Sequence, residues 1–228
     1  MTEAQTLQIG ADRSKGPVSA ILQKPENTNA LYVMAHGAGA DMRHRFLQSM
    51  AEELETTGIA TLRFNFPYTE QGRKAPDPQP VLEAYVRSAC AAAMDAAPGV
   101  PVFAGGKSMG GRMTSNAIAK ETIPGVRGLI FLGFPLHAPN RPSRDRAAHL
   151  ERVPVPMLFL QGTRDDLAEI GLIREVTGEL KGRATLHEIE GADHSFEVRK
   201  SSGRTSAEVR KELAATIAHW SDQVIRKP

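Results

Sequence analysis

Cysteine is nearly absent from this chain of 228 residues, which contains only Cys90. A single cysteine excludes an internal disulfide and leaves no thiolate cluster for a zinc site. It also fits a reducing compartment, so we expect a cytoplasmic protein. The alanines on either side of Cys90 indicate that it lies on a packed helix face.

Long apolar runs are missing as well. No stretch approaches the roughly 20 apolar residues that a membrane-spanning helix needs. The stretch 1–15 lacks the basic and then apolar regions of a secretory leader, so we expect neither a leader nor a membrane association.

An excess of charge of one sign is the third absence, because 28 lysines and arginines face 26 aspartates and glutamates. This balance gives no general reason to expect binding to nucleic acid or to an acidic membrane. Internal repeats are also absent, which argues against a solenoid. The length lies within the usual range of roughly 50 to 250 residues for a domain, and we therefore expect one domain, 1–228.

Continuous apolar runs that end in glycine or proline predict buried strands, and segments with helical spacing separate them. Strands in which apolar and polar residues do not alternate are typical of a parallel sheet that is covered on both faces. A capping-box pattern at Thr205–Glu208 begins a long terminal helix, and two short stretches near the amino terminus predict an antiparallel edge pair. The sequence therefore predicts a doubly wound, mostly parallel α/β sheet, with ligands beyond the carboxyl ends of the strands. The expected strands are 6–9, 18–22, 30–35, 59–66, 100–104, 128–134, 156–160 and 184–189. The apolar faces of three expected helices are formed by Phe46, Met50 and Leu54 in the first, by Leu82, Val86, Ala89 and Ala93 in the second, and by Val209, Leu213, Ile217, Trp220 and Val224 in the terminal one.

The stretch GGKSMGG at 105–111 follows one of these strands and fits two motifs. A P-loop would require a glycine where Pro101 stands, so the phosphate-binding interpretation fails. The other motif is GxSxG, a sharp turn from strand to helix that exposes a serine hydroxyl. Ser108 is then the candidate nucleophile, and the amide of Met109, at the start of the helix, is a candidate oxyanion donor.

A second oxyanion donor should come from the loop after an earlier strand. The segment 35–40, AHGAGA, directly follows the run 31–34, and its small residues leave backbone amides accessible. We expect the amide of Ala38 to be this donor, with Gly39 as the next choice. We also expect His36, Gly37, Gly39 and Lys107 to line the substrate-binding side of the site.

A serine nucleophile needs a base and a group that orients the base. Asp165 and Asp166 follow the strand 156–160, and His194 follows the run 184–189. The order Ser108, aspartate, His194 is the chain order of α/β-hydrolases. His137 also follows a strand but would break this order, and spacing alone cannot rank Asp165 against Asp166, although we favour Asp165. Asp193 is expected to be a turn residue of the histidine loop.

Together these motifs resemble the α/β-hydrolase superfamily over essentially the whole chain. The wording HGAGA, GGKSMGGR, QGTRD and GADHSF is most similar to the small, lid-less, dienelactone-hydrolase-like branch, including a hydrolase-like subunit of the animal NSL histone acetyltransferase complex. The resemblance implies that Ser108, Asp165 and His194 are nucleophile, acid and base, and that no metal or organic cofactor is needed. Two departures matter: dienelactone hydrolases use cysteine where Ser108 stands, and 135–154 is too short for a cap domain.

The leading hypothesis is therefore a serine hydrolase that cleaves an ester, thioester or related acyl bond of a small molecule. The alternative is a non-catalytic binding or scaffold protein with the same fold. Arginines and a lysine in loops after strands also permit two interpretations, an anionic substrate or a solvated basic rim. These residues are Arg43, Arg45, Arg73, Lys74, Arg141, Arg144 and Arg146.

Overall fold

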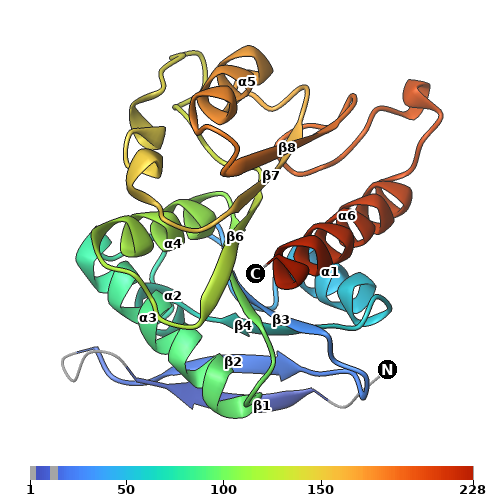
Figure 1. Cartoon of the computed structure of the whole chain (residues 1–228). Helices are drawn as coiled ribbons and strands as arrows, with labels where there is room; N and C mark the ends of the chain where they lie inside the picture. Colours follow the sequence, from blue (N-terminus) through green and yellow to red (C-terminus); the bar gives the residue numbers. More distant parts are fainter. Residues whose placement is uncertain (1–3, 11–14, 228) are drawn as a thin grey trace.

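The protein is built on one eight-stranded sheet. The computed structural model describes residues 4–10 and 15–227, and its strands lie in the order β1-β2-β4-β3-β5-β6-β7-β8 (Figure 1). The pairs β1–β2 and β2–β4 are antiparallel, and all other neighbours in the sheet are parallel, which confirms the predicted fold class. The strands are β1 (Gln5–Ile9), β2 (Val18–Gln23), β3 (Ala30–Ala35), β4 (Ile59–Phe64), β5 (Val102–Lys107), β6 (Val126–Leu132), β7 (Met157–Gly162) and β8 (Ala184–Ile189).

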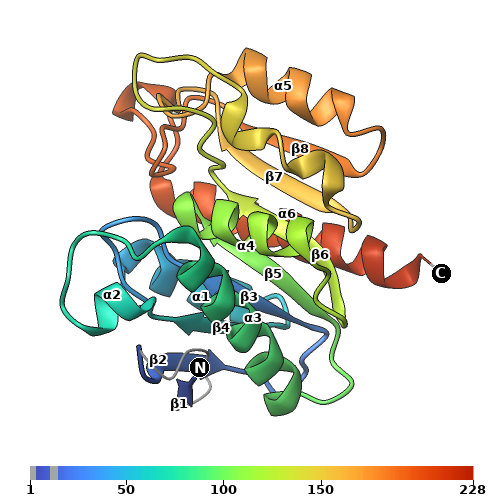
Figure 2. The same ribbon diagram turned by 90° about the vertical axis from the view of Figure 1, so that its left-hand side faces the viewer.

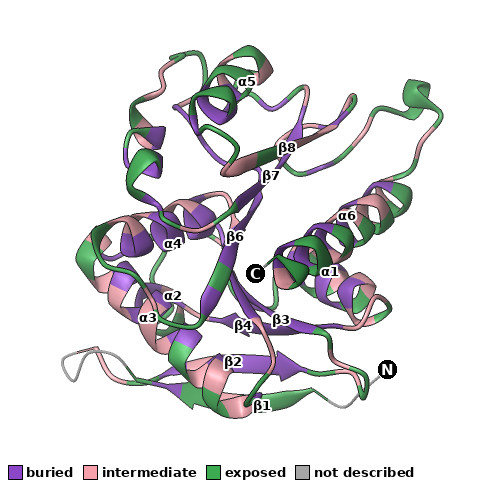
Figure 3. Ribbon diagram, viewed as in Figure 1, coloured by how far each residue is buried: buried purple, intermediate pink, exposed green. Residues whose placement is uncertain are grey.

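Helices cover both faces of the sheet. Figure 2 shows α3 and α4 in front of the sheet and α6 behind it, and Figure 1 shows α1 beside α6. The buried residues lie along the strands and on the inward sides of the helices (Figure 3), as expected for three layers. The helices are α1 (Arg45–Glu55), α2 (Pro67–Glu70), α3 (Gln79–Ala96), α4 (Met109–Lys120), α5 (Ile170–Glu179) and α6 (Ser206–Arg226).

The terminal helix α6 forms as the sequence pattern predicts. The Thr205 side chain accepts from the amide of Glu208, and the Glu208 carboxylate accepts from the amide of Thr205, which completes a capping box. The apolar stripe from Val209 to Val224 is buried against the sheet and α1. Burial of this stripe holds the start of α6 beside the loop that follows β8.

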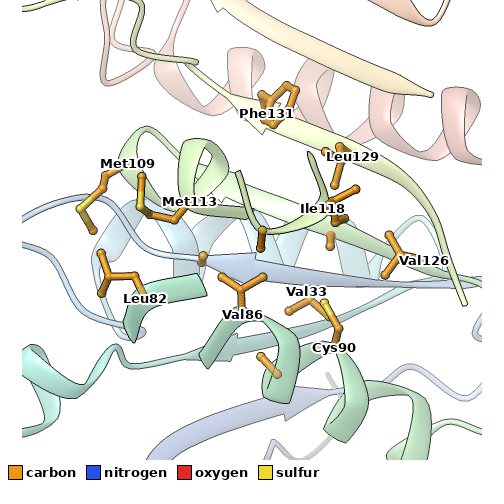
Figure 4. Packing of buried hydrophobic residues seen from close by; sticks show 14 of the residues in the cluster. Val33, Leu82, Val86, Cys90, Met109, Met113, Ile118, Val126, Leu129 and Phe131 are labelled. Atoms are coloured by element: carbon orange, nitrogen blue, oxygen red, sulfur yellow. The ribbon is translucent and has the colours of Figure 1, made fainter. Parts of the chain in front are cut away.

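The opposite face is packed by α3 and α4. Leu82, Val86 and Cys90 of α3 lie against α4 and the sheet (Figure 4). Complete burial raises the pKa of the Cys90 thiol to about 12, so it remains protonated and acts as a small apolar side chain. The expectation of a packed helix face at Cys90 is confirmed.

Two differences from the predicted elements have physical reasons. Strand β5 continues three residues beyond Ala104, because Gly105 and Gly106 pass between β3 and β6 without side chains. The apolar pattern does not predict helix α5, because Ile173 and Val176 are the only apolar residues that the helix buries fully.

The segment 133–156 between β6 and β7 contains only two short 3-10 helices, Asp145–Ala147 and Leu150–Arg152, and no cap domain. Within residues 4–10 and 15–227, no helix is both long and apolar enough to span a bilayer.

Candidate active site

A strained turn between β5 and α4 presents Ser108. Its φ of 52° and ψ of −118° are unusual for a residue with a side chain. The glycines two residues away permit the turn, since a Cβ at Gly106 would lie 2.1 Å, and one at Gly110 2.3 Å, from the carbonyl oxygen of Ala35. The close approach of backbones therefore explains why glycine flanks the serine in this sequence.

Replacing Gly106 by alanine is expected to prevent stable folding. The new Cβ would overlap the backbone of β3, and the φ of 138° at this position disfavours any side chain. Gly171→Ala is the matched control, because it lies in helix α5 with open space around it and should stabilise the protein by up to about 1 kcal/mol. Thermal unfolding of both variants tests this, and a Gly106→Ala protein as stable as the wild type would contradict it.

Three side chains from distant parts of the chain form one line of hydrogen bonds. The Ser108 hydroxyl lies 2.9 Å from His194 Nε2, and His194 Nδ1 lies 2.6 Å from Asp165 Oδ2. Because a carboxylate only accepts, Nδ1 carries the proton and Nε2 is left to accept from Ser108. The Asp165 side chain is fully buried, whereas one fifth of the His194 side chain is exposed. His194 can therefore accept the proton of Ser108, and its exposed part leaves this position open to a ligand.

Asp165 is held by more than the histidine. Its Oδ1 accepts from the amide of Leu167 at 2.8 Å, and its Oδ2 accepts from Gln161 Nε2 at 2.5 Å. Gln161 in turn accepts from the amide of Phe134, so it joins the ends of β6 and β7. Asp166 is exposed. Gln161 is a supporting residue that the motif of the catalytic groups does not mark, and its position in QGTRD, four residues before Asp165, is the signal in the sequence that could identify it.

The loop that carries His194 is fixed by Asp193. Its Oδ1 accepts from the amides of Ser195 at 2.8 Å and Glu197 at 3.0 Å, which confirms the expected turn role. The amide of Phe196 also donates to the carbonyl of Asp193. These bonds hold the imidazole beside the end of β5.

The two expected oxyanion donors belong to segments that border Ser108. Met109 is the first residue of α4, so its amide has no partner within the helix. The loop after β3 also approaches this turn, since a Cβ at Gly37 would lie 3.7 Å from Ser108 Cβ. Ala38 and Gly39 are the next residues of this loop, and both are exposed. A carbonyl oxygen beside Ser108 could thus meet amides from both loops, although the role of Met109 and Ala38 as donors stays a prediction.

His36 occupies a different place from the one expected. It is fully buried; Nδ1 donates to the carbonyl of Gly37, and Nε2 accepts from the amide of Phe66. Burial lowers the pKa of His36 to about 4, which keeps the ring neutral for both bonds. The ring therefore ties the loop after β3 to the loop after β4 instead of facing a substrate.

Lys107 also differs from its expected substrate-binding position. Part of the residue is exposed, but its Nζ is sealed from solvent behind the His194 loop. The ammonium group therefore cannot touch a ligand in this conformation.

Two other histidines form hydrogen bonds that serve the fold. His137 uses both ring nitrogens on backbone groups, those of Ala138 and Glu169. His149 Nε2 lies 2.7 Å from the Ser115 hydroxyl, but both residues are buried between α4 and the segment before β7. Ser115 is thus a second serine that bonds a histidine, and its burial removes it from any substrate.

Three of the seven basic residues expected at the rim are engaged by other groups. Arg73 pairs with Asp77, Arg144 pairs with Glu175 and Glu179, and Arg146 donates to the carbonyl of His137. This pairing favours the solvated basic rim over a cluster dedicated to an anionic substrate.

Comparison with known proteins agrees with this fold. A family model described as an alpha/beta hydrolase domain matches residues 28–222. A dienelactone hydrolase from Anabaena variabilis has a similar structure, with a TM-score of 0.77, 18% identity and coverage of 96% of each chain. An α/β serine hydrolase without a lid from Xanthomonas campestris has a TM-score of 0.73 and 20% identity, again over 96% of each chain. An α/β serine hydrolase homologue from Coxiella burnetii has a TM-score of 0.74 and 18% identity, over 93% of this chain and 96% of the other.

Proposed function

The chain belongs to the α/β-hydrolase family, and on that basis we propose that it is a serine hydrolase that cleaves an ester, thioester or related acyl bond. The observation that carries the proposal is the line of hydrogen bonds from Ser108 through His194 to Asp165. Hydrolases with this constellation use the serine as nucleophile and the histidine as general base. The proposed reaction uses only side chains and backbone amides of this chain, together with water.

In the first half of the reaction, His194 Nε2 takes the proton of Ser108 as its oxygen attacks the substrate carbonyl. The negative charge that develops on the carbonyl oxygen is stabilised by the amides of Met109 and Ala38. Asp165 keeps the proton on Nδ1 and stabilises the imidazolium ion that forms. His194 then gives the proton to the leaving group, and an acyl-enzyme remains on Ser108.

In the second half, water attacks the acyl-enzyme and His194 accepts its proton. The tetrahedral intermediate uses the same two amides, and its collapse returns the proton to Ser108 and releases the acid. Both halves require the partial exposure of His194, because each leaving group and the water must reach Nε2.

The substrate is proposed to be a small acyl compound. The segment between β6 and β7 carries no cap that could enclose a long acyl chain. The similarity to a dienelactone hydrolase, an enzyme named for a small cyclic ester, points in the same direction. An anionic substrate is the weaker proposal, since three of the six rim arginines are engaged by other groups.

A fluorophosphonate probe tests the proposal directly. We expect the wild-type protein to be labelled at Ser108, as mass spectrometry of the labelled peptide would show, and Ser108→Ala to remain unlabelled. Ser115→Ala is the matched control and should label like the wild type, because its hydroxyl is buried against His149.

The competing hypothesis is a non-catalytic scaffold of the same fold, related to the histone acetyltransferase subunit. It predicts no labelling of the folded wild-type protein and no turnover on a panel of esters and thioesters. That result would overturn the proposed function.

A further inference from the structure

Lys107, directly before the nucleophile, carries a buried ammonium group that the proposed reaction does not use. Its Nζ has essentially no exposed surface and no hydrogen-bond partner among residues 4–10 and 15–227. Burial of an unpaired charge is costly, and a methionine would fill the same space without that cost. A lysine at this position therefore lowers the stability of the folded protein, and stability by itself gives no reason for its presence.

The ammonium group lies against the loop that holds the imidazole. It sits 5.6 Å from the centre of the Phe196 ring, two residues after His194. A Cβ placed on Gly133 would be 3.1 Å from Lys107 Nζ and 3.5 Å from His194 Nδ1. The ammonium group and the imidazole thus both lie close to Gly133, in the loop after β6.

Three titratable groups face this cation. Asp165 comes from the loop after β7, and Asp193 and His194 come from the loop after β8. Burial lowers the pKa of Lys107 to about 8 from the ordinary 10.5, while the two carboxylates act in the opposite direction. The loops after β3 and β6 also approach Lys107, since a Cβ at Gly37 would lie 3.8 Å from its Cγ and one at Gly133 would lie 3.1 Å from its Nζ.

We propose that Lys107 is a positioning residue whose buried ammonium is the counter-charge of Asp165, so that His194 remains unprotonated and ready to act as a base. The inference rests on the proposed role of His194. Without the cation, the buried Asp165 carboxylate would keep its hydrogen bonds from Leu167, Gln161 and His194 but would lose its counter-charge, and its negative charge would draw a second proton onto His194 at a higher pH. With the cation present, that protonation is disfavoured.

The test is the pH at which His194 takes up its second proton, measured by NMR of histidine-labelled protein. The His194 signals are assigned by their loss in His194→Gln. In Lys107→Met the midpoint of this titration should rise by about one to two pH units, as expected for removal of one nearby charge in a partly buried site. Lys24→Met removes an exposed lysine between β2 and β3, away from the site, and should leave the midpoint unchanged.

Stability provides a second readout, which reports that the charge of Lys107 is buried, whereas the His194 titration reports its effect on the imidazole. Because the folded protein binds this proton less tightly than the unfolded chain, the cost of Lys107 is full below pH 8 and shrinks as the pH rises toward 10.5. Lys107→Met should therefore raise the thermal midpoint at pH 7 by a few degrees and raise it less near pH 10.

A His194 midpoint in Lys107→Met within a few tenths of a pH unit of the wild type would overturn the inference. If that variant does not fold, Lys107→Gln removes the same charge and decides the question in its place. The NMR comparison does not need turnover. A wild-type protein that neither labels nor hydrolyses esters would refute the proposed function, while a shifted midpoint would still support the role of Lys107.

Discussion

Ser108→Ala is expected to lower turnover by at least about 10³-fold and by up to about 10⁶-fold, with the fold unchanged. The hydroxyl is the group that His194 Nε2 faces at 2.9 Å, and alanine leaves no nucleophile at the turn. The measurement is kcat/KM on the best ester of a panel, with circular dichroism to confirm folding. His194→Ala should cause a loss of similar size, since the nucleophile is not activated without its base.

The double variant distinguishes a concerted unit from two independent contributions. If Ser108 and His194 act together, Ser108→Ala/His194→Ala should be no less active than the worse single variant. Ser115→Ala is the control, because it removes the other serine hydroxyl that bonds a histidine. It should keep wild-type kcat/KM and lose about 1 kcal/mol of stability. Full activity in either single variant at the site would refute the assignment.

Asp165→Asn is expected to lower kcat by about 10³- to 10⁴-fold while the protein remains folded. The asparagine amide cannot accept from Nδ1 in the same way when its NH₂ group faces the ring, so the imidazole takes the tautomer that cannot accept from Ser108. The bonds from Gln161 and Leu167 hold the position of the side chain in the wild type. The pre-steady-state rate of acylation, measured with an activated ester, reports the defect directly.

Asp166→Asn is the matched control for this change, because it alters the neighbouring carboxylate in the same loop. Asp166 is exposed, and Asp165 is the residue within 2.6 Å of His194 Nδ1. The control should keep nearly all of its activity. A large loss in Asp166→Asn with little effect in Asp165→Asn would show that the loop rearranges when substrate binds.

The turn at Ser108 illustrates what local sequence reveals. The pattern GxSxG after an apolar run predicted a strand, a sharp turn and a helix, and the structure has all three. The glycines at 106 and 110 carried this information because a side chain at either position would collide with Ala35. A close approach of two backbones excludes side chains, so the glycines that it requires can be recognised in the sequence.

His36 and Lys107 illustrate what local sequence does not reveal. Both stand in motifs that line the site, and both were expected to face a substrate. The His36 ring turns instead to the amide of Phe66, and the Lys107 ammonium turns behind the His194 loop. The direction of a side chain in such a loop depends on partners about 30 to 90 residues away in the chain, such as Phe66 and Phe196, which no local pattern encodes.

The sequence by itself determined the fold class, the buried strands, the capped terminal helix and the short list of residues at the carboxyl ends of the strands. These features follow from local periodicity, turn residues and steric demand. Only the tertiary structure decided that Asp165 and not Asp166 meets His194, that Gln161 supports it, and that a buried lysine lies beside the imidazole. Those outcomes depend on how parallel strands place their ends side by side, and there distances of a few ångströms between remote residues decide which groups interact.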